Sequence, residues 1–196
     1  MNDVFLETIR CEDGKALHLH YHQLRYESVL HSLGSQEYKN LANLIKPPRQ
    51  GVYRCRVSYT TQEISIEYLP YEKRKVSRLK LLHADTIKYS KKYKNREEIN
   101  QLFEKKAEAD DILIVQNKKI TDTSIANIAF FDGKRWYTPK EPLLKGTTRA
   151  RLLDEGKIFE KDIFEKDIYC FQRVALLNAM IDFDIIAKEN IRDIYC

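Results

Sequence analysis

The chain has 196 residues, of which 43% are hydrophobic, and its 34 Lys+Arg against 29 Asp+Glu leave a formal net charge of +5. This length and hydrophobic content fit one sizeable globular domain or two small ones. Basic and acidic residues are mixed along most of the chain, so the charge gives no indication of a nucleic-acid-binding protein.

The cysteines and the apolar segments predict the environment of the protein. The four cysteines are far apart, form no C-x-x-C pair and have no histidine at metal-ligand spacing, which argues against a zinc site and a disulfide framework: Cys11, Cys55, Cys170 and Cys196. The N-terminal sequence has no basic segment before an apolar run, and no stretch approaches the roughly 20 apolar residues of a membrane span. We therefore expect a soluble, cytoplasmic protein with no metal and no membrane partner.

The first part of the chain predicts two β-hairpins with a helical region between them. The helical region runs from about His22 to Leu44, with Leu24, Leu30 and other apolar residues at roughly helical spacing and Gly34 as a candidate interruption. Turn residues separate short alternating or β-branched segments in each hairpin, which pair residues 4–10 with 16–19 and residues 52–60 with 63–69.

The rest of the chain predicts a mixture of strands and helices. Residues 71–77 are polar and charged and follow Pro70, which is typical of a linker between domains. The expected elements after it are a strand at 79–82, an amphipathic helix that contains Ile99, Leu102 and Phe103, a buried strand at 111–116, a hairpin at 125–139 that turns at Asp132-Gly133, a helix at 148–155 and a strand at 174–177. We expect an α+β protein with a smaller N-terminal lobe (1–70) and a C-terminal lobe (78–196). Residues 159–168 repeat the pentapeptide FEKDI, whose period fits neither a helix nor a strand.

Three segments carry candidate site residues, and each has a plain structural alternative. In GTTRARLL, Thr147 and Thr148 stand at the start of a predicted helix, which is typical of a phosphate site and equally of a simple N-cap. Asp122 precedes an apolar strand that contains Asn127. A carboxylate near a core needs a cationic or donor partner, and a protonated pyridine nitrogen is one such partner. The structural alternative is that Asp122 caps a turn. Arg25, one helical turn after His22, suits a phosphate or faces solvent.

The lysine cluster Lys91, Lys92 and Lys94 is by itself compatible with a solvated basic patch. The order of the motifs, however, resembles the class IV aminotransferase family, the fold type IV pyridoxal-phosphate enzymes. The features that carry this resemblance are His-x-x-Arg at 22–25, Lys-x-x-Asn-Arg at 92–96, acid-x4-Asn at 122–127, Thr-Pro at 138–139 and Gly-x-Thr-Arg at 146–149.

The resemblance implies a role for each of these residues. Lys92 would be the Schiff-base lysine, Asp122 would pair with the ring nitrogen of pyridoxal 5'-phosphate, and Arg25 would bind its phosphate. The backbone N–H groups of Thr147 and Thr148 would complete the phosphate site. The remaining cofactor-binding positions that it implies are Asn127 and Asn178.

The sequence also departs from the family pattern. Aspartate stands at position 122 where relatives usually carry glutamate, and the N-terminal lobe is expected to be shortened, because relatives have a longer segment before the stretch that is NDVFLETIR here. The predicted architecture is the two-lobed, D-amino-acid aminotransferase-like fold with a shortened N-terminal lobe.

The resemblance implies three functions. The first is an aminodeoxychorismate lyase of folate biosynthesis, which converts 4-amino-4-deoxychorismate to 4-aminobenzoate and pyruvate. The second is an aminotransferase for branched-chain or D-amino acids, in which Arg54 and Arg56 would bind the substrate carboxylate or simply lie on an exposed strand face. The third is a non-catalytic relative that binds the cofactor. Relatives are homodimers that act on small amino-acid-like substrates, so we expect a homodimer here.

Overall fold

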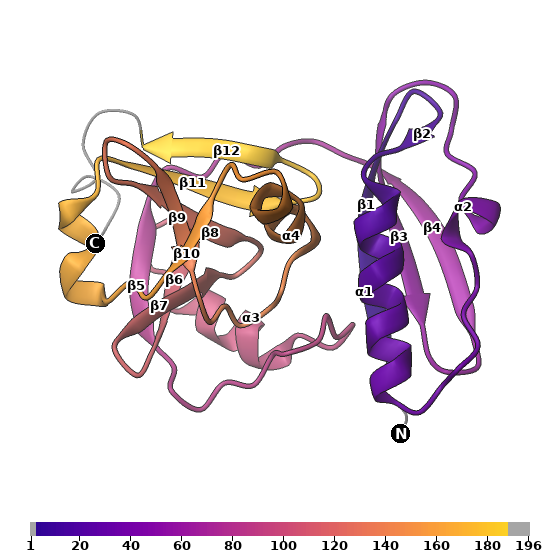
Figure 1. The fold of residues 1–196 in the computed structure, drawn as a ribbon, viewed down its shortest axis with the longest axis horizontal. Coiled ribbons are helices and arrows are strands. Elements are labelled where there is room, and N and C mark those ends of the chain that lie inside the picture. The colour runs from indigo at the N-terminus through magenta and orange to yellow at the C-terminus, as the bar shows by residue number, and fades with distance from the viewer. Residues whose placement is uncertain (1–2, 188–196) are drawn as a thin grey trace. The chain divides into compact units, whose positions relative to one another are not determined.

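The computed structural model of the protein describes residues 3–187, so Cys196 and the end of the predicted C-terminal lobe lie outside the described residues. The chain forms two compact units, which are drawn in Figure 1. Unit 1 comprises residues up to Lys73 together with Lys91–Asn95, and unit 2 comprises Arg74–Ser90 and the chain from Arg96 onward.

The division differs from the expected lobes in one respect, which concerns Lys92. We expected this lysine in the lobe 78–196, but the segment Lys91–Asn95 belongs to unit 1. The reason is backbone pairing, because the N–H of Leu6 donates to the carbonyl of Lys92 and the N–H of Lys94 donates to the carbonyl of Val4. The chain therefore returns to unit 1 after it has entered unit 2.

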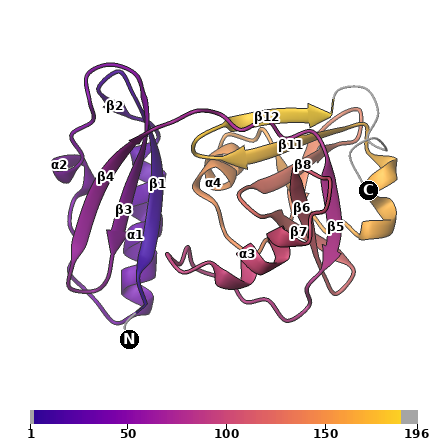
Figure 2. The same cartoon turned by 180° about the vertical axis from the view of Figure 1, so that it is seen from behind.

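Unit 1 is a four-stranded antiparallel sheet with a helix along one face. The strand order is β2-β1-β3-β4, with β1 Phe5–Glu12, β2 Lys15–Ala16, β3 Val52–Tyr59 and β4 Ile64–Pro70. The predicted hairpin of 52–60 with 63–69 is confirmed, whereas in the first hairpin the second strand is only Lys15–Ala16 and pairs with Glu12 and Cys11, because α1 already begins at Leu19. Figures 1 and 2 show α1, Leu19–Ser32, lying along the sheet, and a short helix α2, Leu41–Leu44, follows it.

The core of unit 1 follows from the alternation of side chains along the strands. Alternate residues of β1 and β3 face α1 and are buried, with Phe5, Ile9, Cys55, Val57 and Tyr59 among them. Thr8, Arg10, Arg54 and Arg56 occupy the intervening positions and are only partly buried. We call the sheet face that carries these four residues the open face.

The helical region differs from the predicted one in its ends and in its buried side. Gly34 has φ +85° and ends α1, so the predicted interruption is confirmed. The buried side chains of α1 are His22, Tyr26, Val29 and Leu30, whereas Leu24 is 49% exposed. The prediction that Leu24 lies on the apolar face of the helix is therefore wrong, because His22 and Tyr26 occupy the positions that face the sheet.

Unit 2 is built around an eight-stranded sheet. Six strands follow the order β10-β9-β8-β7-β6-β5, and β11 pairs with both β8 and β12. The strands are β5 Leu79–His83, β6 Asp111–Gln116, β7 Lys119–Thr123, β8 Asn127–Phe131, β9 Trp136–Pro139, β10 Phe159–Lys161, β11 Arg173–Asn178 and β12 Asp182–Ala187. The predicted buried strand is β6, whose Ile112 to Val115 are fully buried.

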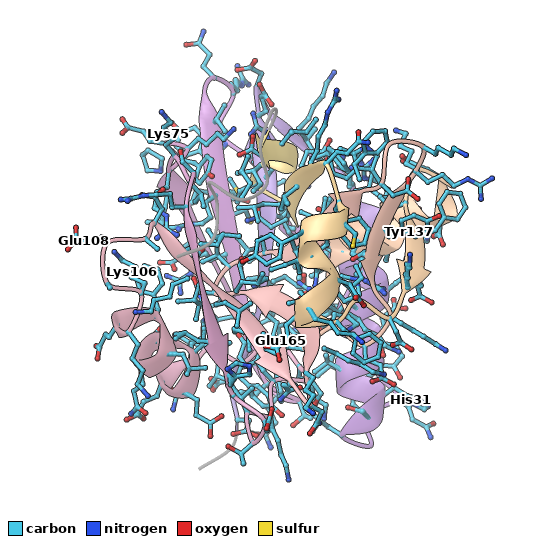
Figure 3. All side chains as sticks on the ribbon, turned by 90° about the vertical axis from the view of Figure 1, so that its left-hand side faces the viewer. His31, Lys75, Lys106, Glu108, Tyr137 and Glu165 are labelled. Atoms are coloured by element: carbon cyan, nitrogen blue, oxygen red, sulfur yellow. The ribbon has the colours of Figure 1, made fainter. Side chains whose placement is uncertain are left out.

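Three helices complete unit 2. They are α3, Glu97–Glu104, α4, Thr147–Asp154, and the 3₁₀ helix η1, Glu165–Cys170. Gly156 follows α4 with φ +64°, as expected for a residue just past a helix end. Glu165, labelled in Figure 3, lies at the start of η1 and pairs with the Nε2 of His83 at 2.6 Å. The predicted amphipathic helix with Ile99, Leu102 and Phe103 is α3, and the helix predicted at 148–155 is α4, which begins and ends one residue earlier.

Candidate functional site

Lys92 is held at the edge of the unit 1 sheet. The hydrogen bonds from Leu6 N to Lys92 O and from Lys94 N to Val4 O are 2.8 and 2.7 Å long, and Tyr93 forms an isolated antiparallel bridge with Phe5. This pairing fixes the main chain of Lys92 to a buried strand.

The two residues on either side of Lys92 lie against Phe5. The ring of Tyr93 lies 5.3 Å from the ring of Phe5, and the Nζ of Lys91 lies 5.8 Å from the Phe5 ring centroid. Phe5 and Tyr93 belong to the core cluster beneath α1. The N–H of Tyr93 donates to the carbonyl of Lys91 at 3.0 Å, so the chain makes a tight turn centred on Lys92 and does not continue as a strand there.

Arg25 is bound by a fully buried carboxylate, that of Glu7 on β1. The Nε of Arg25 donates to Glu7 Oε1 at 2.7 Å and its Nη2 donates to Oε2 at 2.6 Å. The Nδ1 of His22 lies 2.6 Å from the same Oε2. Glu7 and His22 are 0% and 1% exposed, and Arg25 is 14% exposed. Of the three side chains, the arginine alone retains appreciable surface.

Burial and charge set the protonation states of this group. Burial alone would raise the pKa of Glu7, but the Arg25 charge and the hydrogen bonds from His22 and Arg25 outweigh it and lower the pKa to about 2. Burial lowers the pKa of His22, and the charges of Arg25 and Lys92 lower it further, against the pull of Glu7. At neutral pH the group is therefore an ionised glutamate, a neutral histidine that donates from Nδ1, and a charged arginine.

Asp122, in β7 of unit 2, is buried and 5% exposed. Its Oδ1 accepts a 2.7 Å bond from Asn127 Nδ2, and its Oδ2 accepts a 2.9 Å bond from the N–H of Leu144. Burial raises the pKa of Asp122 to about 7, although these hydrogen bonds act in the opposite direction. A carboxylate in this state gains stability from a cation that reaches its remaining lone pairs.

The Asn127 amide joins Asp122 to the start of α4. Its Nδ2 also donates to the carbonyl of Leu144 at 2.8 Å, and a Cβ added at Gly146 would lie 2.0 Å from Asn127 Oδ1. Gly146 is the N-cap residue of α4 and makes no side-chain cap hydrogen bond. Only glycine lets this amide pack so closely against the chain at position 146.

The first turn of α4 presents Thr147 and Thr148. Both are buried, at 7% and 6% exposure. The first N–H groups of an α-helix have no partner within the helix, and the helix dipole favours an anion there. These two residues therefore stand in the position expected of a phosphate site.

Asn178, at the end of β11, uses its amide to hold the turn into β12. Its Oδ1 accepts hydrogen bonds from the N–H groups of Met180 and Ile181, and its Nδ2 donates to the carbonyl of Ile125. The predicted contact of Asn178 with a phosphate stays a prediction.

Arg54 and Arg56 lie on the open face of unit 1. Arg54 stands directly opposite Arg10 in the register of β1 and β3, and like charges in such a pair destabilise a sheet unless anions lie near. Arg10 pairs with Glu12, and Arg56 lies 3.3 Å from the exposed Glu67. The Nε of Arg54 is buried and makes no hydrogen bond within the described part of the chain.

The structure thus gathers the predicted residues into two groups, one in each unit. Lys92, Arg25, Arg54 and Arg56 are in unit 1, and Asp122, Asn127, Thr147, Thr148 and Asn178 are in unit 2. The sequence analysis missed Glu7, which binds Arg25. The available signal was a charged residue at a position of FLETI that alternates with Phe5 and Ile9 and so had to face the core.

No group of three or more His, Cys, Asp or Glu side chains in residues 3–187 is placed to hold a metal ion. No helix in the same range has the length and apolar character needed to cross a membrane.

The motifs and their placement are those of a known family. A family model described as "Amino-transferase class IV" matches residues 4–187. The chain belongs to the class IV aminotransferase family. The prediction made from the ordered motifs is therefore confirmed, and this family member is an enzyme of the pyridoxal-phosphate-dependent class.

Individual relatives agree with this family and its fold. An uncharacterized protein of Haemophilus influenzae is 41% identical over 180 residues, which cover 89% of this chain and 96% of the relative. The crystal structure of a "putative 4-amino-4-deoxychorismate lyase" from Haemophilus somnus 129PT has a TM-score of 0.86 and 35% identity, covering 92% of this chain and 97% of that one. An aminotransferase from Brucella abortus bound to the cofactor PLP has a TM-score of 0.75 at 15% identity, covering 94% and 80%, and shows the shared fold. The predicted α+β, fold type IV architecture is confirmed.

Proposed function

We propose that this class IV family member is a pyridoxal-phosphate-dependent lyase that converts 4-amino-4-deoxychorismate to 4-aminobenzoate and pyruvate. The similarity to the Haemophilus somnus protein, which extends over almost the whole of both chains, supports the lyase reaction. The Brucella abortus relative, which binds PLP, supports the cofactor. Folate biosynthesis, a cytoplasmic location and a homodimeric assembly are parts of the same proposal.

The observation that carries the cofactor proposal is that Asp122 is a buried carboxylate whose hydrogen-bond donors are uncharged. Its hydrogen-bond donors are a neutral amide and a backbone N–H, and its pKa is raised to about 7. A protonated ring nitrogen is the cation that would return this carboxylate to its ionised form. The residues present therefore fit the cofactor at its ring nitrogen, with aspartate in place of the usual glutamate.

The residues also fit the cofactor at its phosphate. The N–H groups of Thr147 and Thr148 begin α4, three residues after the Leu144 N–H that binds Asp122. Hydrogen bonds thus connect the carboxylate for the ring nitrogen to Leu144, in the segment that leads into the helix end for the phosphate. Arg25 would supply a guanidinium, the side chain best suited to bind a phosphate with paired donors.

In the proposed reaction Lys92 is the group that moves protons. Bound pyridoxal phosphate supplies an electron sink that stabilises negative charge on the substrate carbon next to nitrogen. The Lys92 amine would take the proton from that carbon and return a proton to the three-carbon fragment that leaves as pyruvate. Asp122 would keep the ring nitrogen protonated throughout.

Arg54 and Arg56 are proposed to bind substrate carboxylates. They lie on the open face of unit 1, and the Nε of Arg54 is buried without a hydrogen-bond acceptor among the described residues. An aminotransferase for branched-chain or D-amino acids would use the same arginines for its substrate carboxylate. The description of the matching family model, "Amino-transferase class IV", supports this second candidate.

The first experiment is a visible absorption spectrum of the protein with added pyridoxal phosphate, before and after borohydride. We expect a band that borohydride removes, and a reduced cofactor that mass spectrometry finds on Lys92. Lys92→Ala should lose both the band and the adduct, because no other amine would be placed for the linkage. Lys91→Ala and Lys94→Ala are matched controls from the same segment and should keep them. A band that persists in Lys92→Ala would assign the linkage to another residue.

A second assay separates the candidate reactions. The lyase should release pyruvate and 4-aminobenzoate from 4-amino-4-deoxychorismate without a keto acid. An aminotransferase would instead require a keto acid and form the matching amino acid. A protein that gains the band but turns over neither class of substrate would be the non-catalytic, cofactor-binding relative.

A further inference from the structure

We propose that Glu7 is a positioning residue that fixes the direction of the Arg25 guanidinium for the cofactor phosphate, with His22 fixing Glu7 in turn. This inference rests on the proposed function, because it concerns how the phosphate is bound. It assigns a role to the one fully buried carboxylate of the described β1 strand.

The geometry of the pair fixes the orientation of the Arg25 guanidinium. Glu7 engages the Nε and Nη2 atoms in a two-bond arrangement of 2.7 and 2.6 Å. A guanidinium is planar, so fixing this edge also fixes the direction in which the Nη1 edge points. An arginine without such a partner would lose rotational freedom when it binds a phosphate, and that loss weakens binding.

The burial of the group leaves Glu7 no surface of its own for a ligand. Glu7 is 0% exposed and His22 is 1% exposed, so neither carboxylate nor imidazole has surface for a ligand. Arg25 keeps 14% of its surface. The group therefore meets solvent, or a ligand, at the arginine.

His22 holds the other side of the carboxylate. Its Nδ1 lies 2.6 Å from Glu7 Oε2, the oxygen that also accepts from Arg25 Nη2. His22 and Arg25 are three residues apart on α1, so one helix face presents both donors to a strand carboxylate. Glu7 thus ties the direction of Arg25 to the packing of α1 on the sheet.

The charge on Glu7 works against phosphate binding. An orienting role of Glu7 can therefore be distinguished from an electrostatic one. A carboxylate beside Arg25 partly cancels the positive potential that attracts a phosphate. If electrostatics alone mattered, the pair would weaken the site. We infer that the benefit is orientation, and a substitution that keeps the charge but changes the reach tests this directly.

The test variant is Glu7→Asp, measured by the ratio of the affinities for pyridoxal phosphate and for pyridoxal, which lacks the phosphate. Aspartate keeps the charge but is one methylene shorter, so it cannot hold both Arg25 nitrogens in the same place. We expect this ratio to fall about tenfold, equivalent to about 1.4 kcal/mol, while the affinity for pyridoxal stays unchanged. Arg25→Lys should lower the ratio as well, because lysine lacks the planar fork.

The double variant Glu7→Asp/Arg25→Lys shows whether Glu7 acts through Arg25. A positioning role predicts no further fall in the ratio beyond Arg25→Lys alone, since the two residues act as one unit. Glu12→Asp, which changes the Arg10 partner on the same strand, is the matched control and should leave the ratio unchanged. Thermal unfolding of each variant identifies any that fail to fold. If Glu7→Asp does not fold, His22→Gln is the second variant. It removes the imidazole ring from Glu7 and should also lower the ratio.

The outcomes separate this inference from the proposed function. If the wild-type protein binds neither pyridoxal phosphate nor pyridoxal, the proposed function fails. If the wild type prefers the phosphorylated form and folded Glu7→Asp keeps the same ratio, the positioning role is overturned and the cofactor proposal stands. Additive losses in the double variant would equally contradict a role through Arg25.

Discussion

At the scale of single residues, Asp122 couples the stability of the protein to pH. Burial raises the pKa of Asp122 from its ordinary value of 3.8 to about 7. The folded chain then binds a proton more tightly than the unfolded chain between these pH values. The contribution of Asp122 to stability is therefore largest below pH 3.8 and is lost as pH rises through 7. The full loss is on the order of 4 kcal/mol, at about 1.4 kcal/mol per pH unit.

Asp122→Asn tests this coupling in urea unfolding of the protein without added cofactor. Asparagine cannot ionise, so the variant should gain stability relative to the wild type as pH rises from 4 to 8. A constant difference between the two proteins across this range would show that Asp122 does not carry the raised pKa. Added pyridoxal phosphate should reduce the pH dependence of the wild type, since a cationic partner favours the ionised carboxylate.

At the scale of elements, the contact between the start of α4 and β8 depends on Gly146. Its φ of −73° is open to any residue, so the requirement for glycine comes from the neighbouring Asn127 side chain. Gly146→Ala would force Asn127 away from Asp122 and from Leu144. We expect a loss of about 1–3 kcal/mol in the free energy of unfolding, as for overpacking in a core.

A double-mutant cycle checks the cause of that loss. In an Asn127→Ala background the added methyl group has no amide to displace, so Gly146→Ala should cost much less there. Gly34→Ala is a contrasting control, because nothing lies within 4 Å of the new Cβ and its cost of about 1–2 kcal/mol would come from φ +85° alone. Equal losses from Gly146→Ala in both backgrounds would rule out the contact with Asn127 as the reason.

At the scale of the whole molecule, the two units should respond to acid with opposite signs. In unit 1, Glu7 contributes stability that is complete above pH 4.5 and lost as pH falls toward 2, on the order of 3 kcal/mol. His22, whose pKa is also lowered, adds a loss that begins as pH falls below 6.5. In unit 2, Asp122 adds stability as pH falls from 7 toward 3.8.

Hydrogen exchange followed by mass spectrometry can resolve the two responses in one sample. Between pH 7 and pH 4 we expect protection factors of β1 and β3 amides to fall while those of β6 and β8 hold or rise. Asp122→Asn should remove the rise in unit 2 and leave unit 1 unchanged. A parallel fall of protection in both units would contradict separate titrating groups.

The sequence by itself determined the family, the α+β class, the β3–β4 hairpin of unit 1 and most elements of unit 2. These depend on local properties, namely alternation, turn residues, glycine beyond a helix end, and motifs in a fixed order. The sequence also placed Lys92, Arg25 and Asp122 as the candidate residues. Their proposed roles follow from the family resemblance and await the experiments above.

Tertiary structure alone decided the environment of those residues. No local pattern could show that Lys91–Asn95 returns to the edge of β1, because that pairing joins segments more than 80 residues apart. The two copies of FEKDI make the same point, since the first enters β10 beside β9 while the second leads into η1. The burial of Glu7 against Arg25 and the raised pKa of Asp122 likewise depend on neighbours that only the folded chain supplies. Burial and charge pairing depend on contacts between residues that are distant in the sequence. For that reason only the tertiary structure determines them.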